Sequence, residues 1–233
     1  MDKIDEIILA YNLLVKGIES RANNDESDRA YGGIIRAGKG MLVENITKLI
    51  LEIAWLKIGG NPNRISFEKQ IKKLPIRKDY INELTNSDIR KFILENIDNY
   101  YYSIKTDVHC NIDGVLVVGA ECKAYTENAM MKRILVDFTL MKQAWPNLNC
   151  FLIQLESQLG GDYSSISKTV KTGSPSTHTL FSYFDVDLKI VTLLEGERKV
   201  DKPIHKSDYY KELTRTSLES AIHQFEIALK KYL

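Results

Sequence analysis

The most informative residues of this sequence are two acids and a lysine, Asp107, Glu121 and Lys123, on the two arms of a predicted β-hairpin. Carboxylates held a few ångströms apart repel each other unless a divalent cation lies between them. Mg²⁺ prefers oxygen ligands, and carboxylates together with a substrate phosphate oxygen form its usual protein site. A lysine two residues from such a ligand shares its strand face and can point at an attacking water or a phosphate. The pattern therefore indicates metal-assisted chemistry on a phosphate group.

The hairpin is predicted over residues 103–125. Its first arm alternates apolar and polar residues, and its second arm is almost entirely small or apolar. Asp113-Gly114 between two such runs favours a tight turn. We expect a three-residue loop that begins at Ile112, because that register puts both acids and the lysine on one face of the sheet. A two-residue loop would instead put Asp107 on the opposite face from Glu121.

The arrangement of Thr106-Asp107, an apolar run and then Glu121-Cys122-Lys123 resembles the active-site motif of the PD-(D/E)xK nuclease superfamily. Threonine replaces proline, which is the least constant part of that motif. The order strand, strand, helix, strand that follows Asp107 is also similar to the core of that superfamily. As a whole, the chain most resembles a type II restriction endonuclease.

The resemblance implies Mg²⁺-dependent, sequence-specific hydrolysis of double-stranded DNA that leaves 5′-phosphate ends. Asp107 and Glu121 would bind the metal, with the carbonyl of Cys122 as a third ligand, and Lys123 would orient the nucleophilic water. Glu44, on a predicted N-terminal helix, matches the glutamate that many restriction endonucleases place beside the metal. A palindromic recognition site would imply a homodimer with one active site per strand.

Two other interpretations remain open at this point. A repair or junction-resolving nuclease of the same superfamily would use the same three residues. A non-catalytic α/β domain that binds DNA or protein would use the hairpin acids only as surface ion pairs. A second Glu-x-Lys triplet, Glu197-Arg198-Lys199 with Asp187 upstream, lacks the apolar run and follows a turn, so we rank it lower.

Composition and charge indicate a globular protein with a buried core. The chain has 233 residues, of which 44 % are hydrophobic, and a net charge of +1, so DNA would need a local basic surface. No apolar run is long enough to cross a membrane and the N-terminus has no secretory signal, so we expect a cytoplasmic protein. Its three cysteines have no CxxC spacing, which favours reduced core thiols.

The fold class that the patterns favour is α/β, with a central mixed β-sheet, an active-site hairpin and flanking helices. We expect a single domain, 1–233, with a mainly helical part at 1–99, a catalytic core at 100–195 and C-terminal helices at 207–233. Apolar periodicity predicts helices and buried strands. The helices are at 2–22, 41–58, 79–99 and 127–143, and the strands are at 150–155 and 188–194. Thr216 and Glu219 have capping-box spacing, which marks a helix start in the C-terminal segment.

Three polar or basic segments are expected to contact DNA. Residues 23–40 are glycine-rich and are predicted to form a long loop, 61–78 is the clearest basic segment, and 156–178 is a polar loop. A simple connector and a solvated charged face explain the first two equally well. His109 shares the face of Asp107, although a lone histidine is more often structural. The candidate DNA contacts are Arg36, Lys39, Lys72, Lys73, Gln158, Lys168, Lys171, Ser174 and His178.

Overall fold

A five-stranded mixed sheet forms the centre of the computed structural model, which describes residues 2–22, 28–161, 173–204 and 206–233. The strand order is β1-β4-β5-β6-β7. Strands β1, β4 and β5 pair antiparallel, and β5, β6 and β7 pair parallel, which confirms the predicted mixed α/β architecture. The strands are β1 (Ile65–Ser66), β4 (Val108–Ile112), β5 (Val115–Thr126), β6 (Asn149–Ser157) and β7 (Leu188–Thr192).

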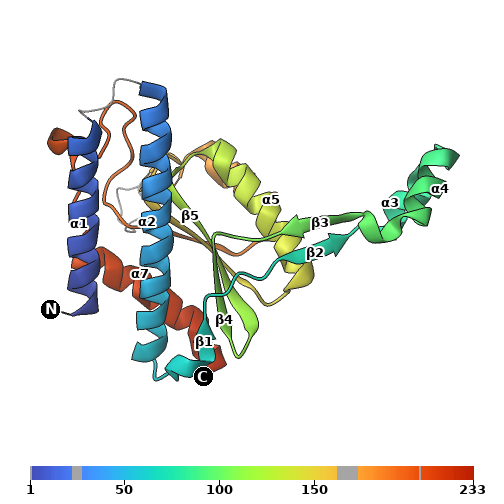
Figure 1. Cartoon of the computed structure of the whole chain (residues 1–233), viewed down its shortest axis with the longest axis horizontal. Helices are drawn as coiled ribbons and strands as arrows, with labels where there is room; N and C mark the ends of the chain where they lie inside the picture. Colours follow the sequence, from blue (N-terminus) through green and yellow to red (C-terminus); the bar gives the residue numbers. More distant parts are fainter. Residues whose placement is uncertain (1, 23–27, 162–172, 205) are drawn as a thin grey trace.

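Helices cover both faces of this sheet (Figure 1). On one face, α2 (Asp28–Lys57) and α7 (Arg215–Leu229) pack against the strands, with α1 (Lys3–Ala22) beside them. On the other face lie α5 (Asn128–Ala144) and α6 (Pro175–Phe181). Short 3₁₀ helices are formed by Pro62–Arg64, Ile97–Asn99, Ser207–Tyr209 and Lys230–Tyr232.

Each face of the sheet has its own hydrophobic cluster. The larger cluster joins α1, α2 and α7 to side chains such as Val118, Phe151 and Ile153. The smaller one joins α5 to Leu116 and Leu152. The central strands are apolar on both sides because both sides are covered. All three cysteines are buried and unpaired, as predicted. No helix within the described residues is long and apolar enough to cross a membrane.

The hairpin turn differs from the prediction. Ile112 pairs with Val115, so the loop has two residues, Asp113 and Gly114, and both have positive φ, as a type I′ turn requires. The register then shifts between Cys110 and Asn111, which leaves Val117 as an extra, bulged residue. A bulge reverses the alternation of faces by one residue. The tight turn and the bulge together put Asp107 and Glu121 on one face of the sheet, which is the arrangement predicted from a three-residue loop.

The glycine-rich segment is helical from residue 28 onwards, so the predicted loop over residues 23–40 is wrong for that part. Residues 23–27 lie outside the described part of the chain. An added Cβ at Gly38 or Gly40 would meet no atom within 4 Å, so these glycines mark no close backbone approach. The helix that is predicted over residues 41–58 continues towards the N-terminus as far as Asp28, because extending a helix costs little once it has formed.

The C-terminal helix α7 starts two residues earlier than its sequence signal indicates. Thr214 is the N-cap, and its side chain accepts a hydrogen bond from the amide of Ser217. The capping box predicted at Thr216 is therefore wrong, and Glu219 instead pairs with Arg215 along the helix. Both threonines are good cap residues, so local sequence alone does not choose between them.

An arm extends sideways from the body (Figure 1). Strands β2 (Lys72–Pro75) and β3 (Tyr101–Ile104) form a two-stranded antiparallel ribbon. The helices α3 (Lys78–Glu83) and α4 (Ser87–Glu95) lie at its far end, where one helical region was predicted over residues 79–99. The basic segment predicted at 61–78 thus supplies β1, a connector and one strand of the arm.

Replacing Gly114 by alanine tests the turn. Gly114 has φ +76°, where a Cβ crowds the backbone, so Gly114→Ala should lower the free energy of unfolding by about 1–2 kcal/mol and the Tm by roughly 2–6 °C. Gly40→Ala, in the open middle of α2, is the matched control and should stabilise by about 0.4–1 kcal/mol. Thermal and urea unfolding would contradict this account if both variants moved in the same direction.

Candidate active site

The two acids and the lysine of the hairpin converge on one point. The ammonium of Lys123 lies 2.8 Å from Asp107 Oδ2 and 2.6 Å from Glu121 Oε2. The same Asp107 oxygen accepts a hydrogen bond of 2.9 Å from the backbone amide of Cys122. Strand β5 supplies Glu121 and Lys123 at alternate positions, and Asp107 enters from the residue before β4. The bulge at Val117 is what sets Asp107 opposite Glu121.

Burial and neighbouring charges divide the two carboxyl groups. Burial raises the pKa of Glu121 to about 7, with the Asp107 charge acting in the same direction and Lys123 opposing it. Burial acts the same way on Asp107, but the Lys123 ammonium and the Cys122 amide outweigh it and hold its pKa below the usual range. Burial lowers the pKa of Lys123, yet the two carboxylates more than compensate and raise it. Lys123 and Asp107 are therefore charged at neutral pH, and Glu121 is close to its midpoint.

Oxygen atoms around Lys123 Nζ fit a divalent cation. The two carboxylate oxygens and the Cys122 carbonyl, which is 3.3 Å away, all lie around one positive centre. Hard oxygen donors are the set that Mg²⁺ or a similar ion prefers. Within the described residues, no group of three or more acidic, histidine or cysteine side chains is placed to hold a metal ion, so the two carboxylates would need the backbone carbonyl as a further ligand. A metal here would be held by Asp107, Glu121 and the carbonyl of Cys122.

A cleft of about 530 Å³ opens over these side chains. Its walls come from Lys69 and β3, from residues 105–107 before β4, from β5 and from α5. Four cations line it, namely Lys69, Lys105, Lys123 and Arg133. Three acids share the lining, namely Asp107, Glu121 and Asp137, and the last of these pairs with Arg133. A cavity with this balance of charge suits a phosphodiester backbone.

The sequence reasoning missed Lys69 and Arg133 as site residues. Lys69 was included only in a general basic segment, and no local signal distinguishes it from its neighbours. Arg133 and Asp137 have an i,i+4 spacing that looks like an ordinary surface pair on a helix. Their place in the lining of the cleft follows from the packing of α5 beside β5, which the local sequence does not indicate.

Buried polar groups fix the segment that carries Lys69. His109 is fully buried and its two ring nitrogens lie 2.8 Å from the amide nitrogen of Gln70 and 3.1 Å from that of Thr106. The side chain of Gln70 donates to Asn111 and to the carbonyl of Gly114. Residues 69 and 70 are thus tied to β4. His109 therefore has a structural position, the simpler of the two interpretations of this residue.

Glu44 lies beside the cleft rather than among the hairpin side chains. Its carboxylate is 3.9 Å from Lys69 Nζ, and no contact with Asp107 or Glu121 is found. The helix α2 thus reaches the site through Lys69. Thr47, one turn further along, contacts the thiol of Cys122 at 3.4 Å and packs α2 against β5.

The structure distributes the candidate DNA contacts over several places. Lys72 and Lys73 are exposed on the arm, where Lys73 lies over the ring of Tyr101. Lys39 is buried, and burial lowers its pKa to about 8. Nothing is described of the Arg36 side chain, and Lys168 and Lys171 lie outside the described residues.

The remaining candidates lie at the ends of β6 and α6. Gln158 accepts a hydrogen bond from Arg198, and the Ser174 hydroxyl caps α6 by accepting from the Thr177 amide. His178 is exposed on α6. Of these three side chains, only that of His178 is described without a partner within the protein.

The second Glu-x-Lys triplet has a structural role. The carboxylate of Glu197 accepts hydrogen bonds from the backbone amides of Gly160 and Gly161. The guanidinium of Arg198 stacks over the ring of Tyr125. Asp187 pairs with Lys189 on β7. These contacts join the end of β6 to the loop after β7, and they do not bring acids and a lysine together as the hairpin does.

Replacing His109 by leucine tests the buried connection. A neutral imidazole has a single acceptor nitrogen, so the variant removes the acceptor of one of the two backbone amides of Gln70 and Thr106, and we expect a loss of about 1–3 kcal/mol in the free energy of unfolding. Burial and the nearby Lys69 and Lys105 lower the pKa of His109 from 6.5 to about 4. The unfolded chain therefore binds an extra proton between these values, and the stability that depends on neutral His109 is complete above pH 6.5 and is lost as the pH falls towards 4.

Urea unfolding at several pH values would measure this dependence. The difference between the wild-type protein and His109→Leu should be largest at neutral pH and should shrink in acid. A difference that stays constant over that range would show that the imidazole is not held in its neutral form. Gln70→Ala, which removes a neighbouring side chain but no ring acceptor, is the control and should keep the wild-type pH dependence.

Comparisons with known proteins identify the family of the chain. No family model matches the chain. It is 47 % identical over 233 residues to the type II restriction enzyme DdeI of Desulfomicrobium norvegicum, which covers 98 % of this chain and 97 % of that enzyme. A low-resolution structure of the native BbvCI A2B2 tetramer matches with a TM-score of 0.41 and 12 % identity, over 99 % of this chain and 89 % of that one. An identity of this size over the full length places the chain in one family: it belongs to the type II restriction endonucleases.

Proposed function

We propose that Asp107, Glu121 and Lys123 form the catalytic site with which this sequence-specific DNA endonuclease hydrolyses a phosphodiester of double-stranded DNA. One observation carries the proposal. Two carboxylate oxygens and a backbone carbonyl surround a single cationic centre at the floor of a cleft lined by basic side chains. Enzymes of this class generally need a divalent metal, and we propose Mg²⁺.

Each side chain of the hairpin has a distinct part in the proposed reaction. Asp107, Glu121 and the Cys122 carbonyl hold the metal. The bound ion would polarise the phosphate and lower the pKa of a coordinated water. Lys123 is held near both carboxylates, so its ammonium can orient the attacking water and stabilise charge that develops on the phosphate. In-line attack would leave 5′-phosphate and 3′-hydroxyl ends. Glu44 stays a candidate for this site through its neighbour Lys69.

The cations around the cleft are proposed to bind the DNA backbone. Lys69, Lys105 and Arg133 line the cleft and face the position of the scissile phosphate. Lys72 and Lys73 continue the basic surface along the arm and would contact phosphates further along the duplex. Among the polar residues, His178 is exposed on α6, and we keep it as a base-edge contact.

A homodimer is proposed because the described residues contain one such site per chain. The two strands of a duplex are related by two-fold symmetry, so two copies can cut both strands of a palindromic sequence. We also propose the cytoplasm as the compartment in which the enzyme meets its DNA substrate. A repair or junction-resolving role for the same site is the alternative, and the match to a type II restriction enzyme favours site-specific cleavage over it.

Cleavage of a long duplex by the purified enzyme tests this proposal. With Mg²⁺, the wild-type enzyme should yield discrete fragments, and EDTA should abolish them. Lys123→Ala should lower kcat by about 100- to 1000-fold because the charge on the phosphate loses its nearest cation, while DNA binding persists. Asp107→Ala should remove detectable cleavage. Lys189→Ala, a lysine paired with Asp187 on β7, is the matched control and should cut normally.

The assay also separates the alternatives. A Mg²⁺-dependent smear, or cutting confined to branched DNA, would favour a repair or junction-resolving enzyme with the same catalytic residues. Unchanged cleavage by Lys123→Ala would refute the assignment of the site.

The raised pKa of Glu121 predicts a pH-dependent metal affinity. Below about pH 7 this carboxyl group is protonated, and it must lose its proton before it can bind Mg²⁺. The apparent Kd for Mg²⁺ should therefore rise about tenfold for each unit that the pH falls below this value, and should level off above it. Calorimetric titration of the DNA-free protein would measure this. An affinity that stays constant from pH 7 down to roughly pH 5.5 would contradict the assignment.

A further inference from the structure

The tip of the arm, residues 78–99, has little core of its own. Its helices α3 and α4 bury Ile81 and Ile93, and neither side chain belongs to the two hydrophobic clusters of the body. On α4, Ile89, Phe92 and Leu94 are 51 %, 60 % and 56 % exposed. A soluble helix normally buries its apolar residues, and exposed apolar groups gathered in one place mark an interaction surface.

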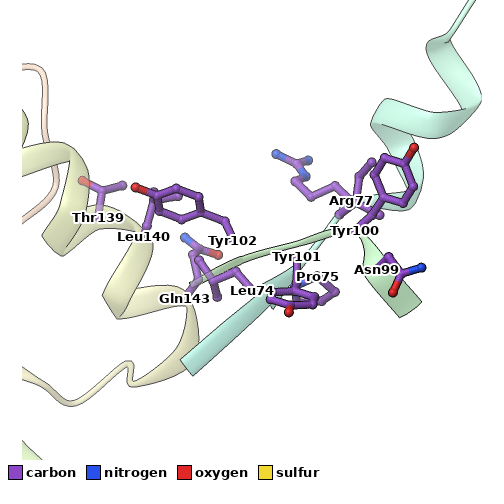
Figure 2. A pocket seen from close by; sticks show the side chains of 11 residues that line it. Leu74, Pro75, Arg77, Asn99, Tyr100, Tyr101, Tyr102, Thr139, Leu140 and Gln143 are labelled. Carbon is purple, nitrogen blue, oxygen red and sulfur yellow. The ribbon is translucent and has the colours of Figure 1, made fainter. Parts of the chain in front are cut away.

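A pocket of about 1030 Å³ lies along the same arm, between the β2–β3 ribbon and α5. Figure 2 shows that tyrosines from β3 and the side chains of Leu74 and Leu140 surround it. Tyrosine and aliphatic side chains in an open pocket are the composition that protein interfaces favour. The pocket extends along the ribbon to Arg77 and Asn99 at the root of the tip, and the exposed apolar side chains of α4 are not among its lining residues.

The charges of the tip and of the ribbon are opposite. Residues 69–77 and 100–105, which form the ribbon and its flanks, contain no acid and five cations: Lys69, Lys72, Lys73, Arg77 and Lys105. The tip contains five acids and three cations: Asp79, Glu83, Asp88, Glu95 and Asp98 against Lys78, Arg90 and Lys91. The acidic excess of the tip disfavours contact with phosphates, and it complements the basic ribbon of another molecule.

We propose that two copies of this chain associate by exchanging arms, so that the tip of each copy packs into the pocket on the side of the other copy's arm. Such an exchange is isologous, because each copy contributes the same two surfaces. Ile89 and Phe92 would enter the pocket, and the acids of the tip would face the basic ribbon. The proposal names the interface of the proposed homodimer and rests on the proposed function only in requiring two copies.

The exchange also links the interface to the active site. Tyr102 lines both the pocket and the catalytic cleft, and Ser103 and Ile104, the next residues of β3, also line the cleft. Each docked tip therefore lies at the edge of the partner's cleft. Two copies joined in this way would place their cleavage sites beside the same duplex.

A mixing experiment tests the exchange. Phe92→Asp alters the tip, and Tyr101→Asp alters the pocket at a side chain that is 44 % exposed, so both variants should fold, as circular dichroism would verify. Each variant alone should raise the dimer Kd by at least about 30-fold in sedimentation equilibrium. An equimolar mixture should recover dimers, because a mixed pair retains one contact between an unaltered tip and an unaltered pocket.

A control and several outcomes make the test decisive. Ile227→Asp on α7 changes an apolar side chain that is 57 % exposed outside the arm, and it should leave the dimer intact. A wild-type monomer, or a Phe92→Asp variant that stays dimeric, would overturn the proposal. A mixture that fails to recover dimers would indicate direct contact between tips, which also overturns it.

Nicking of one DNA strand reports separately on the catalytic site. Monomeric Phe92→Asp that still nicks DNA with Mg²⁺ would support the interface and keep the proposed function. A wild-type dimer that cuts no DNA would count against the proposed catalytic site alone. If Phe92→Asp lost DNA binding but stayed dimeric, the tip would be a DNA contact and the arm exchange would be wrong.

Discussion

The structure depends on one ammonium group held between two carboxylates. The ammonium of Lys123 pairs with the carboxylates of Asp107 and Glu121. Without it, the two buried carboxylates would repel each other, and burial would favour their protonated forms. In such a setting, one carboxylate stays charged and the other lies near neutrality. The cluster therefore already contains the charges that a divalent cation requires. Because its members come from two strands, its existence requires the correct pairing of those strands.

The pairing is controlled by the turn and the bulge of the β4–β5 hairpin. A two-residue turn alone would send Asp107 to the face covered by α2, and the bulged Val117 returns it to the face of Glu121. Arg64 holds the turn from outside, with a bidentate contact to the carboxylate of Asp113 and hydrogen bonds to the carbonyls of the last two residues. The chain terminus and β1 thus secure the register on which the site depends.

The arm and the catalytic cleft share structural parts. The ribbon provides one wall of the cleft, and buried His109 ties the connector before β2 to the strand after Asp107. A change in how the arm is docked would therefore reach Lys69 and Lys105 through a short path of packed residues. In the proposed dimer, this arrangement would couple the assembly of two copies to the position of the cations that would contact DNA.

Local sequence determined the residue types of the site, the hairpin, and the existence and kind of most elements. The strong periodicities of β6, α5 and α7 and the Asp113-Gly114 signal depend on neighbours along the chain. Tertiary structure alone decided the bulge at Val117, the place of Lys69 and the helical start of α2. A bulge is chosen by which side chains can be buried against α2 and α5. Lys69 lies in the cleft because its neighbour Gln70 is bound to His109 and Asn111, which are 39 and 41 positions away in the sequence. Such non-local energies leave no signal in a short stretch of sequence.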